Sequence, residues 1–361
     1  MKINKMFALI RTVMAILIAL ALALVIILLV SETPLEAFKY LLLGPVMRLP
    51  RLANVVEMML PLLFTGLSVS LIARTGIFNL ASEGAFFMGG VIAAIAALKL
   101  PFQGLALPVC SVILGGAAGM AMMLIPVVVR QKFEASEIVC SLMMNYLLFY
   151  LGSFLIRTFV RNPDSGELQS LNFSEQAMLT TLFPGTRIHS GLLVAGVFVL
   201  FFWVYLYKSR WGYRMRIVGS NPHFALYSGI QLTSSIVIAQ ALAGLACGVG
   251  GATEILGMYS SFRWRTAPGP GFGWDGIIVA TLARNNPLLV PIGAFFLAYL
   301  RVGADIMTRM TDVQNEIVSI IQGIVIVLIV AQSFLGGWEK KAIFKAATSN
   351  ADRKGKEASH T

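Results

Sequence analysis

Charged residues are scarce in this sequence: Asp, Glu, Lys and Arg together make up only 12% of its 361 residues, whereas 57% are hydrophobic. About a quarter of a soluble domain is charged, so this composition excludes an ordinary soluble domain. The few charges are unbalanced, because 28 residues are basic and only 17 are acidic, which gives a formal net charge of +11. No basic stripe with interleaved aromatic residues accompanies the excess, which argues against a nucleic-acid partner.

Cysteine is also rare. The three cysteines, Cys110, Cys140 and Cys247, lie in apolar runs without paired spacing, which predicts small buried residues rather than disulfides or a metal site. His189 and the two other histidines are expected to be solvated. The sequence lacks G-x-S-x-G, H-E-x-x-H and the P-loop pattern G-x-x-x-x-G-K-[ST]. We therefore expect no catalytic residues, no metal and no cofactor, and any energy from ATP would have to come from another protein.

Long apolar runs are abundant and predict an all-α polytopic membrane protein, because no barrel-type alternation recurs. Ten membrane elements are expected, including broken or re-entrant half-helices. The runs fall at about 12–30, 54–73, 77–98, 104–129, 138–157, 190–207, 232–253, 274–284, 287–304 and 315–335. A bilayer core needs about 20 helical residues to cross, so the run at 274–284 is too short to span.

The charges at the ends of these runs predict the orientation. We interpret 12–30 as a retained first span rather than a signal peptide, since the run is too long and lacks a cleavage site. With both termini cytoplasmic, a majority of the Lys and Arg residues fall on the cytoplasmic side. This interpretation gives one transmembrane domain, 1–336, with an outer loop at 158–189, a cytoplasmic loop at 208–230 and a basic, disordered cytoplasmic tail at 337–361 that attracts membrane lipid weakly.

Two interrupted segments, 74–90 and 268–287, occupy corresponding positions in the two halves of the chain. Each carries one carboxylate, Glu83 or Asp275, that lies nine residues from an arginine at the predicted cytoplasmic end. At about 1.5 Å per residue, both carboxylates are expected near the middle of the bilayer, about 13 Å deep. Interrupted segments in corresponding positions of two halves are typical of a transport pathway.

Two interpretations of these carboxylates stay open. Asp275 could be a helix N-cap, and Glu83 could accept hydrogen bonds from N–H groups of its own loop. Alternatively, either side chain could contact a substrate, since an ionisable group inside a membrane is costly and by default functional. The candidate translocation-path residues are Asn79, Glu83, Trp274 and Asp275.

Other patterns predict structural roles. The glycine spacings at 115–119 and 244–248 permit close helix contact, within the bundle or at a subunit interface. Glu57 is expected to be an interfacial carboxylate near the outer face. Arg301 and Asp305 are four residues apart on a predicted helix, which favours an ion pair between them.

The predicted cytoplasmic loop, 208–230, contains a second candidate site. After Asn221 and Pro222 a short helix is expected, with Gly229 closing it. A short helix with small and aromatic residues, held below the membrane, suits the docking of another protein.

Three stretches together resemble one family. They are G-I-F-N-L-A-S-E-G at 76–84, V-G-S-N-P-H-F-A-L-Y-S-G-I at 218–230, and G-F-G-W-D-G-I-I-V-A-T-L-A-R-N-N-P at 271–287. In this order they resemble permease subunits of bacterial ABC importers for nucleosides and simple sugars, in the wider group of ribose and branched-chain amino-acid permeases. The likeness covers about residues 10–336.

The resemblance implies a permease subunit in the bacterial inner membrane that is not itself an enzyme. Its implied partners are a second permease subunit, a cytoplasmic ABC ATPase and an extracytoplasmic substrate-binding protein. The ATPase would dock on the loop that holds Gly219, Asn221, Pro222, Ala225 and Gly229. A long N-terminal region and the R-N-N-P ending favour a nucleoside over a simple sugar such as ribose. An ion-coupled secondary transporter, with Glu83 and Asp275 as carriers, is one remaining alternative, and a membrane-embedded enzyme or scaffold is another.

Overall fold

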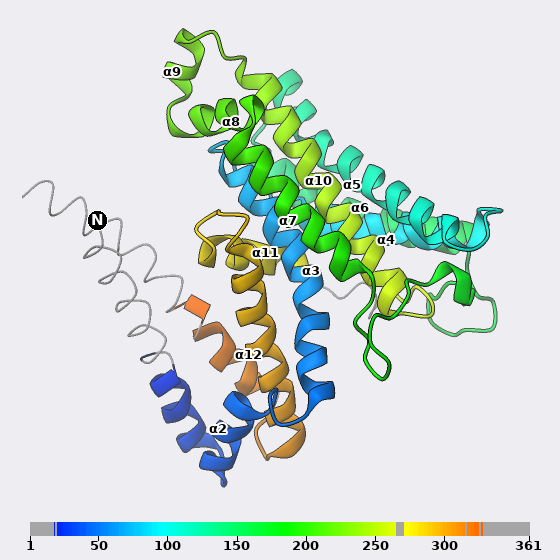
Figure 1. Ribbon diagram of the computed structural model, residues 1–361, viewed down its shortest axis with the longest axis vertical. Coiled ribbons are helices and arrows are strands. Elements are labelled where there is room, and N and C mark those ends of the chain that lie inside the picture. Colours follow the sequence, from blue (N-terminus) through cyan, green and yellow to red (C-terminus); the bar gives the residue numbers. More distant parts are fainter. Residues whose placement is uncertain (1–17, 19, 265–270, 315, 325, 328–361) are drawn as a thin grey trace, which may run out of the picture. The chain divides into compact units, whose positions relative to one another are not determined.

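The computed structural model describes residue 18 and residues 20–264, 271–314, 316–324 and 326–327. These residues are predominantly helical (Figure 1). The labelled helices are α2 (Pro34–Leu43), α3 (Leu49–Ala73), α4 (Ser82–Lys99), α5 (Ala106–Phe133), α6 (Glu137–Phe159), α7 (Gly191–Lys208), α8 (Arg210–Ser220), α9 (Pro222–Tyr227), α10 (Leu232–Met258), α11 (Phe272–Leu282) and α12 (Val290–Met310).

Seven of the described helices are long and apolar enough to cross a membrane, which confirms the all-α polytopic fold. They are α3, α4, α5, α6, α7, α10 and α12. Two shorter apolar helices, Leu20–Val30 and α11, match the expected runs at 12–30 and 274–284. The rest of the first run, the end of the expected run at 315–335 and the tail at 337–361 lie outside the described residues.

The chain divides into two compact units. The smaller consists of residues 1–42 and 304–361, and the larger of residues 43–303. In the smaller unit Asp312 accepts hydrogen bonds from the Ser31 hydroxyl (2.6 Å) and the Glu32 N–H (2.8 Å). These donors stabilise the charged form and lower the pKa of Asp312.

Helix α4 is the centre of the larger unit. Its first ten residues are all buried, because α5, α6 and α10 pack around it. The glycine spacings explain how closely these helices approach. A Cβ added at Gly119 of α5 would overlap the backbone of Gly244 and Gly248 on α10, and one added at Gly89 of α4 would overlap Gly248. The glycines therefore serve packing inside the bundle, as one of the two interpretations predicted.

The predicted outer loop at 158–189 has little regular structure. It contains a single 3-10 turn, Glu175–Ala177, and isolated β-bridges such as Thr181 with His189. Its backbone is fixed to the end of α10, since Leu179 N–H donates to the Leu256 carbonyl at 2.9 Å.

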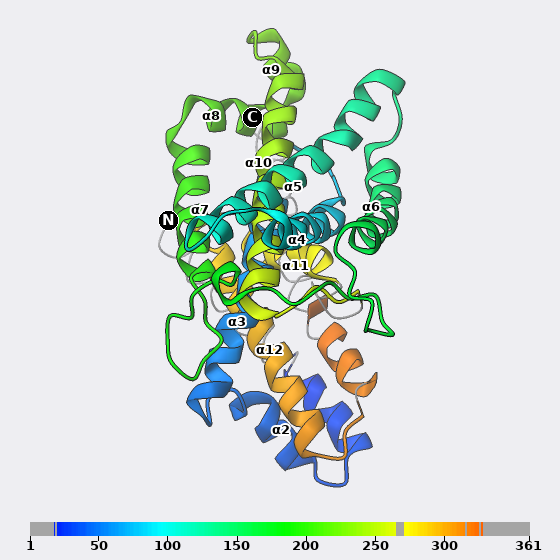
Figure 2. The ribbon, with the colours of Figure 1, turned by 90° about the vertical axis from the view of Figure 1, so that its right-hand side faces the viewer.

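Figures 1 and 2 both place α8 and α9 at one extremity of the larger unit and α11 in its middle. The eleven residues of α11 rise about 16 Å, roughly half of a bilayer core. The expected short, embedded element is thus a real half-helix.

Candidate translocation site

The segment between α3 and α4 is held by a buried hydrogen-bond network centred on Asn79. Its Nδ2 donates to Gln240 Oε1 at 3.0 Å, and its Oδ1 accepts from the Ala81 N–H at 2.8 Å. Gln240 in turn donates to Glu137 at 2.8 Å, and Arg130 pairs with the other oxygen of Glu137 at 2.7 Å. Asn79 is only 4% exposed, and these partners satisfy both ends of its amide.

Helix α6 holds the same segment from another side. Asn145 accepts from the Gly84 N–H and donates to the Leu80 carbonyl, both at 2.9 Å. Ser141 accepts from the Leu80 N–H at 3.1 Å. A non-helical backbone inside a membrane must find such partners, and here Asn145 and Ser141 of α6 supply them.

Glu83 joins the two interrupted segments. Its carboxylate accepts from the N–H groups of Gly271, at 2.6 Å, and Gly273, at 2.5 Å, which are the N-cap and the second residue of α11. The expectation that Glu83 would bond its own loop is wrong, because the N–H groups that it satisfies belong to the other half of the chain. The carboxylate also lies where the positive end of the α11 dipole favours it.

Asp275 is not the N-cap of α11. Gly271 holds that position without a side-chain hydrogen bond, at φ 94°, and Asp275 lies one turn later. Its carboxylate pairs with Arg301 of α12 at 2.5 Å. The expected Arg301–Asp305 pair is wrong as well, since Asp305 pairs with Arg309. The reason is burial: a carboxylate only 6% exposed needs a counter-charge more than an exposed one does.

Trp274 differs from the other candidate residues, because 45% of its surface is exposed while its neighbours Gly273 and Asp275 are buried. Phe78, in the first interrupted segment, is also exposed. The structure thus brings Glu83 together with the start of α11, holds Asn79 in a separate network, and leaves Trp274 facing outward.

Helix α11 is packed tightly against α3. A Cβ added at Gly276 would overlap Thr65, and one added at Gly66 would overlap Val279. Only glycine permits backbones to approach this closely, so the two helices have little room to slide.

Arg74 fixes the other end of α11. Its side chain donates to the Asn285 carbonyl at 2.8 Å and to the Arg284 carbonyl at 3.2 Å. Both of those residues have positive φ and close the helix. The Arg74 carbonyl in turn contacts Gly219, where a Cβ would overlap it. Residues 208–230 are therefore packed against the segment that holds α11.

Residues 208–230 form two helices, of which only the second was expected. Asn221 ends α8 and caps α9, since its Oδ1 accepts from the Phe224 N–H at 3.0 Å. Gly229 closes α9 at φ 73°, as predicted, and Ala225 is buried beneath it. Pro222 occupies the first turn. The outer surface of this pair is aromatic and apolar, with Trp211, Tyr213, Phe224, Leu226 and Tyr227 exposed.

The sequence did not predict that polar side chains are buried near the start of α3 and the end of α10. Glu57 is 5% exposed rather than interfacial, and Glu254, which no sequence pattern marked, is 4% exposed. His189 is 1% exposed rather than solvated, and burial lowers its pKa to about 4. The available signal was a lone carboxylate, Glu254, at the end of an apolar run. Within the described residues no cluster of three His, Cys, Asp or Glu side chains could hold a metal ion.

Comparison with known proteins gives one family. The protein-family model described as "Branched-chain amino acid transport system / permease component" matches residues 51–330. A glucose ABC transporter permease of Haloferax volcanii is 29% identical, over 96% of this chain and 91% of that protein. A guanosine ABC transporter permease of Bacillus subtilis is 30% identical, over 77% of this chain and 80% of that protein. A nucleoside ABC transporter permease of Lactococcus lactis is 25% identical, over 98% and 100%.

The match extends over both interrupted segments and the helical pair between them. The chain is therefore a multi-pass membrane protein that belongs to the family of permease components of branched-chain amino acid transport systems.

Proposed function

We propose that this chain is the membrane-spanning subunit of an ATP-driven importer that carries nucleosides across a bacterial inner membrane. Two of the three relatives compared are named for guanosine or nucleosides, and one is named for glucose. A simple sugar is therefore the alternative substrate.

The observation that carries the proposal is the continuous contact from the exposed helical pair to the half-helix. Gly219 of α8 packs on the Arg74 carbonyl, and the Arg74 side chain holds the carbonyls of Arg284 and Asn285 at the end of α11. A protein that moves α8 and α9 would displace the end of α11. The sequence has no P-loop, so a separate ATPase is the partner that fits this surface.

The translocation path, in this proposal, follows the exposed side of α11 and is completed by a second permease subunit. Trp274 and Phe78 are large apolar side chains that are exposed beside buried polar networks. An aromatic surface of this kind suits the stacking of a flat base. An extracytoplasmic binding protein would deliver the substrate.

The test is uptake of labelled guanosine into proteoliposomes that contain the chain with its partner subunits. Uptake should require ATP and the ATPase, should be inhibited by unlabelled nucleosides but not by glucose or ribose, and should persist when an ionophore collapses ion gradients. Uptake by the chain alone, driven by an ion gradient, would instead establish a secondary transporter.

A further inference from the structure

A hollow of about 660 Å³ lies where α7, α8 and α9 meet. Four cationic residues line it, and none of its lining residues is acidic. They are Lys208, Arg210, Arg214 and Arg216. We call this space the basic hollow. Its volume suits a ligand of headgroup size rather than a single ion.

The four cations have no counter-charge in the part of the chain that the structure describes. Among the described residues none of them pairs with a carboxylate. Arg214 and Arg216 instead lie over aromatic rings, at 5.2 Å from Trp211 and 5.3 Å from Tyr207. The Arg216 Nε is buried and has no hydrogen-bond partner among the residues that the structure describes. Four like charges around one space repel one another, and a bound anion would reverse that repulsion.

Helix α7, which ends at the basic hollow, indicates the source of the bound anion. Helix α7 exposes a continuous apolar face, formed by Leu193, Val197, Leu200, Phe201 and Val204, and it ends at Lys208. A lipid whose acyl chains lie along this face would place its headgroup at the hollow. Trp211 and Tyr213 are exposed beside it, as aromatic residues commonly are at the level of the headgroups.

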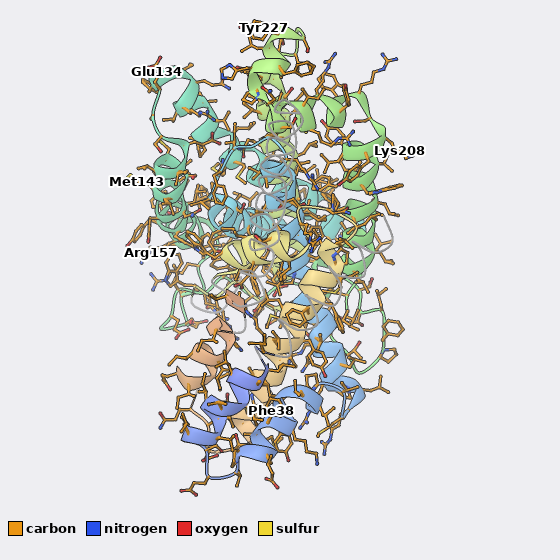
Figure 3. The ribbon with its side chains drawn as sticks, turned by 90° about the vertical axis from the view of Figure 1, so that its left-hand side faces the viewer. Phe38, Glu134, Met143, Arg157, Lys208 and Tyr227 are labelled. Atoms are coloured by element: carbon orange, nitrogen blue, oxygen red, sulfur yellow. The ribbon has the colours of Figure 1, made fainter. Side chains whose placement is uncertain are left out.

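The hollow shares Phe224 and Gly229 with the surface that suits a protein partner, but its cationic residues come from the end of α7 and from α8. Figure 3 shows Tyr227 at the tip of α9 and Lys208 at the side of the bundle, at the end of α7. Tyr227 is 92% exposed and is the natural contact for a docking protein. We propose that the basic hollow binds the phosphate headgroup of an anionic phospholipid, with the acyl chains along α7.

The proposal is tested by native mass spectrometry of the purified chain, from bilayers that contain equal amounts of phosphatidylglycerol and phosphatidylcholine. Wild-type protein should retain one phosphatidylglycerol. The double variant Lys208→Gln/Arg214→Gln should retain it about 25-fold less, since each cation near a lipid surface contributes about fivefold. Both side chains are exposed, so the variant is expected to fold. The charge-conserving variant Lys208→Arg/Arg214→Lys should retain the lipid.

The matched control is Arg157→Gln/Arg161→Gln, which removes two exposed cations at the far end of α6. It should leave lipid retention within about twofold of wild type, because surface charges far from the lipid are screened by salt and contribute little to its binding. Equal loss in both double variants, or none in either, would overturn the site. Displacement of the lipid by millimolar inorganic phosphate would show a free-anion site, and loss of the lipid on ATPase binding would show a protein interface; either result contradicts the proposal.

Discussion

The two candidate regions of this chain treat polar groups in opposite ways. Around the interrupted segments, buried polar side chains such as Asn79, Glu83 and Asp275 have partners on other helices. In residues 208–230, the cations lack carboxylate partners among the described residues, and large aromatic side chains face outward. A buried group with partners fixes the architecture, whereas an exposed group is solvated by water and stays available to a ligand or another protein. The difference assigns rigidity to the first region and binding to the second.

The largest expected effect is that of Glu83→Ala. The substitution leaves the N–H groups of Gly271 and Gly273 without an acceptor, and each hydrogen bond to a charged group contributes about 1.5–3 kcal/mol. The free energy of unfolding should fall by about 3–6 kcal/mol. Thermal unfolding in detergent measures it, with Glu83→Gln, which retains one acceptor, losing about half as much. A Glu83→Ala protein of normal stability that no longer transports would indicate that Glu83 contacts the substrate. That result would contradict the structural role assigned to the first region.

His189 is an exception in this comparison, because it is buried although its Nε2 has no hydrogen-bond partner in the described part of the chain. Its pKa is lowered to about 4 in the folded protein, so the folded state holds it neutral. Protons bind the unfolded chain first, and the stability is lost as the pH falls from about 6.5 towards 4. Between pH 7 and pH 5 the loss should be about 2 kcal/mol.

The unfolding midpoints of wild type and His189→Gln at the two pH values measure this loss. The variant should lack this share of the pH dependence. The same acid-induced shift in both proteins would assign the effect to other groups.

Gly229→Val should have the smallest effect on stability. A β-branched residue at φ 73° costs about 1–2 kcal/mol, and a Cβ there would meet no neighbouring atom within 4 Å. The strain alters the end of α9, so ATP hydrolysis should continue while transport falls. Hydrolysis and uptake measured together in proteoliposomes test this expectation, with Gly104→Val, at φ 64° in a distant loop, as the matched control. Normal coupling in Gly229→Val would remove α9 from the proposed transmission.

The sequence predicted the helices and the half-helix well, because apolar run length and broken glycine-rich backbone are local signals. It also predicted α9, since Asn221, Pro222 and Gly229 act within a few residues. It could not predict partners that lie far apart in the chain, such as Glu83 with Gly271 or Asp275 with Arg301. The Arg301–Asp305 prediction failed for this reason, because spacing on one helix says nothing about a buried carboxylate on another.

The measurement that tests the central claim most directly is the concentration dependence of nucleoside uptake in four proteins. They are wild type, Asp275→Asn, Arg301→Gln and the double variant. Each single variant leaves one charge of the pair without its partner. Each should lose about 2–3 kcal/mol of stability, less than a fully buried pair because Arg301 is partly exposed.

The double variant should recover most of that stability, and KM should remain the same in all four, with the maximal rate following the amount of folded protein. A KM at least tenfold higher in Asp275→Asn but unchanged in Arg301→Gln would contradict the account, since it would place the Asp275 carboxylate on the substrate.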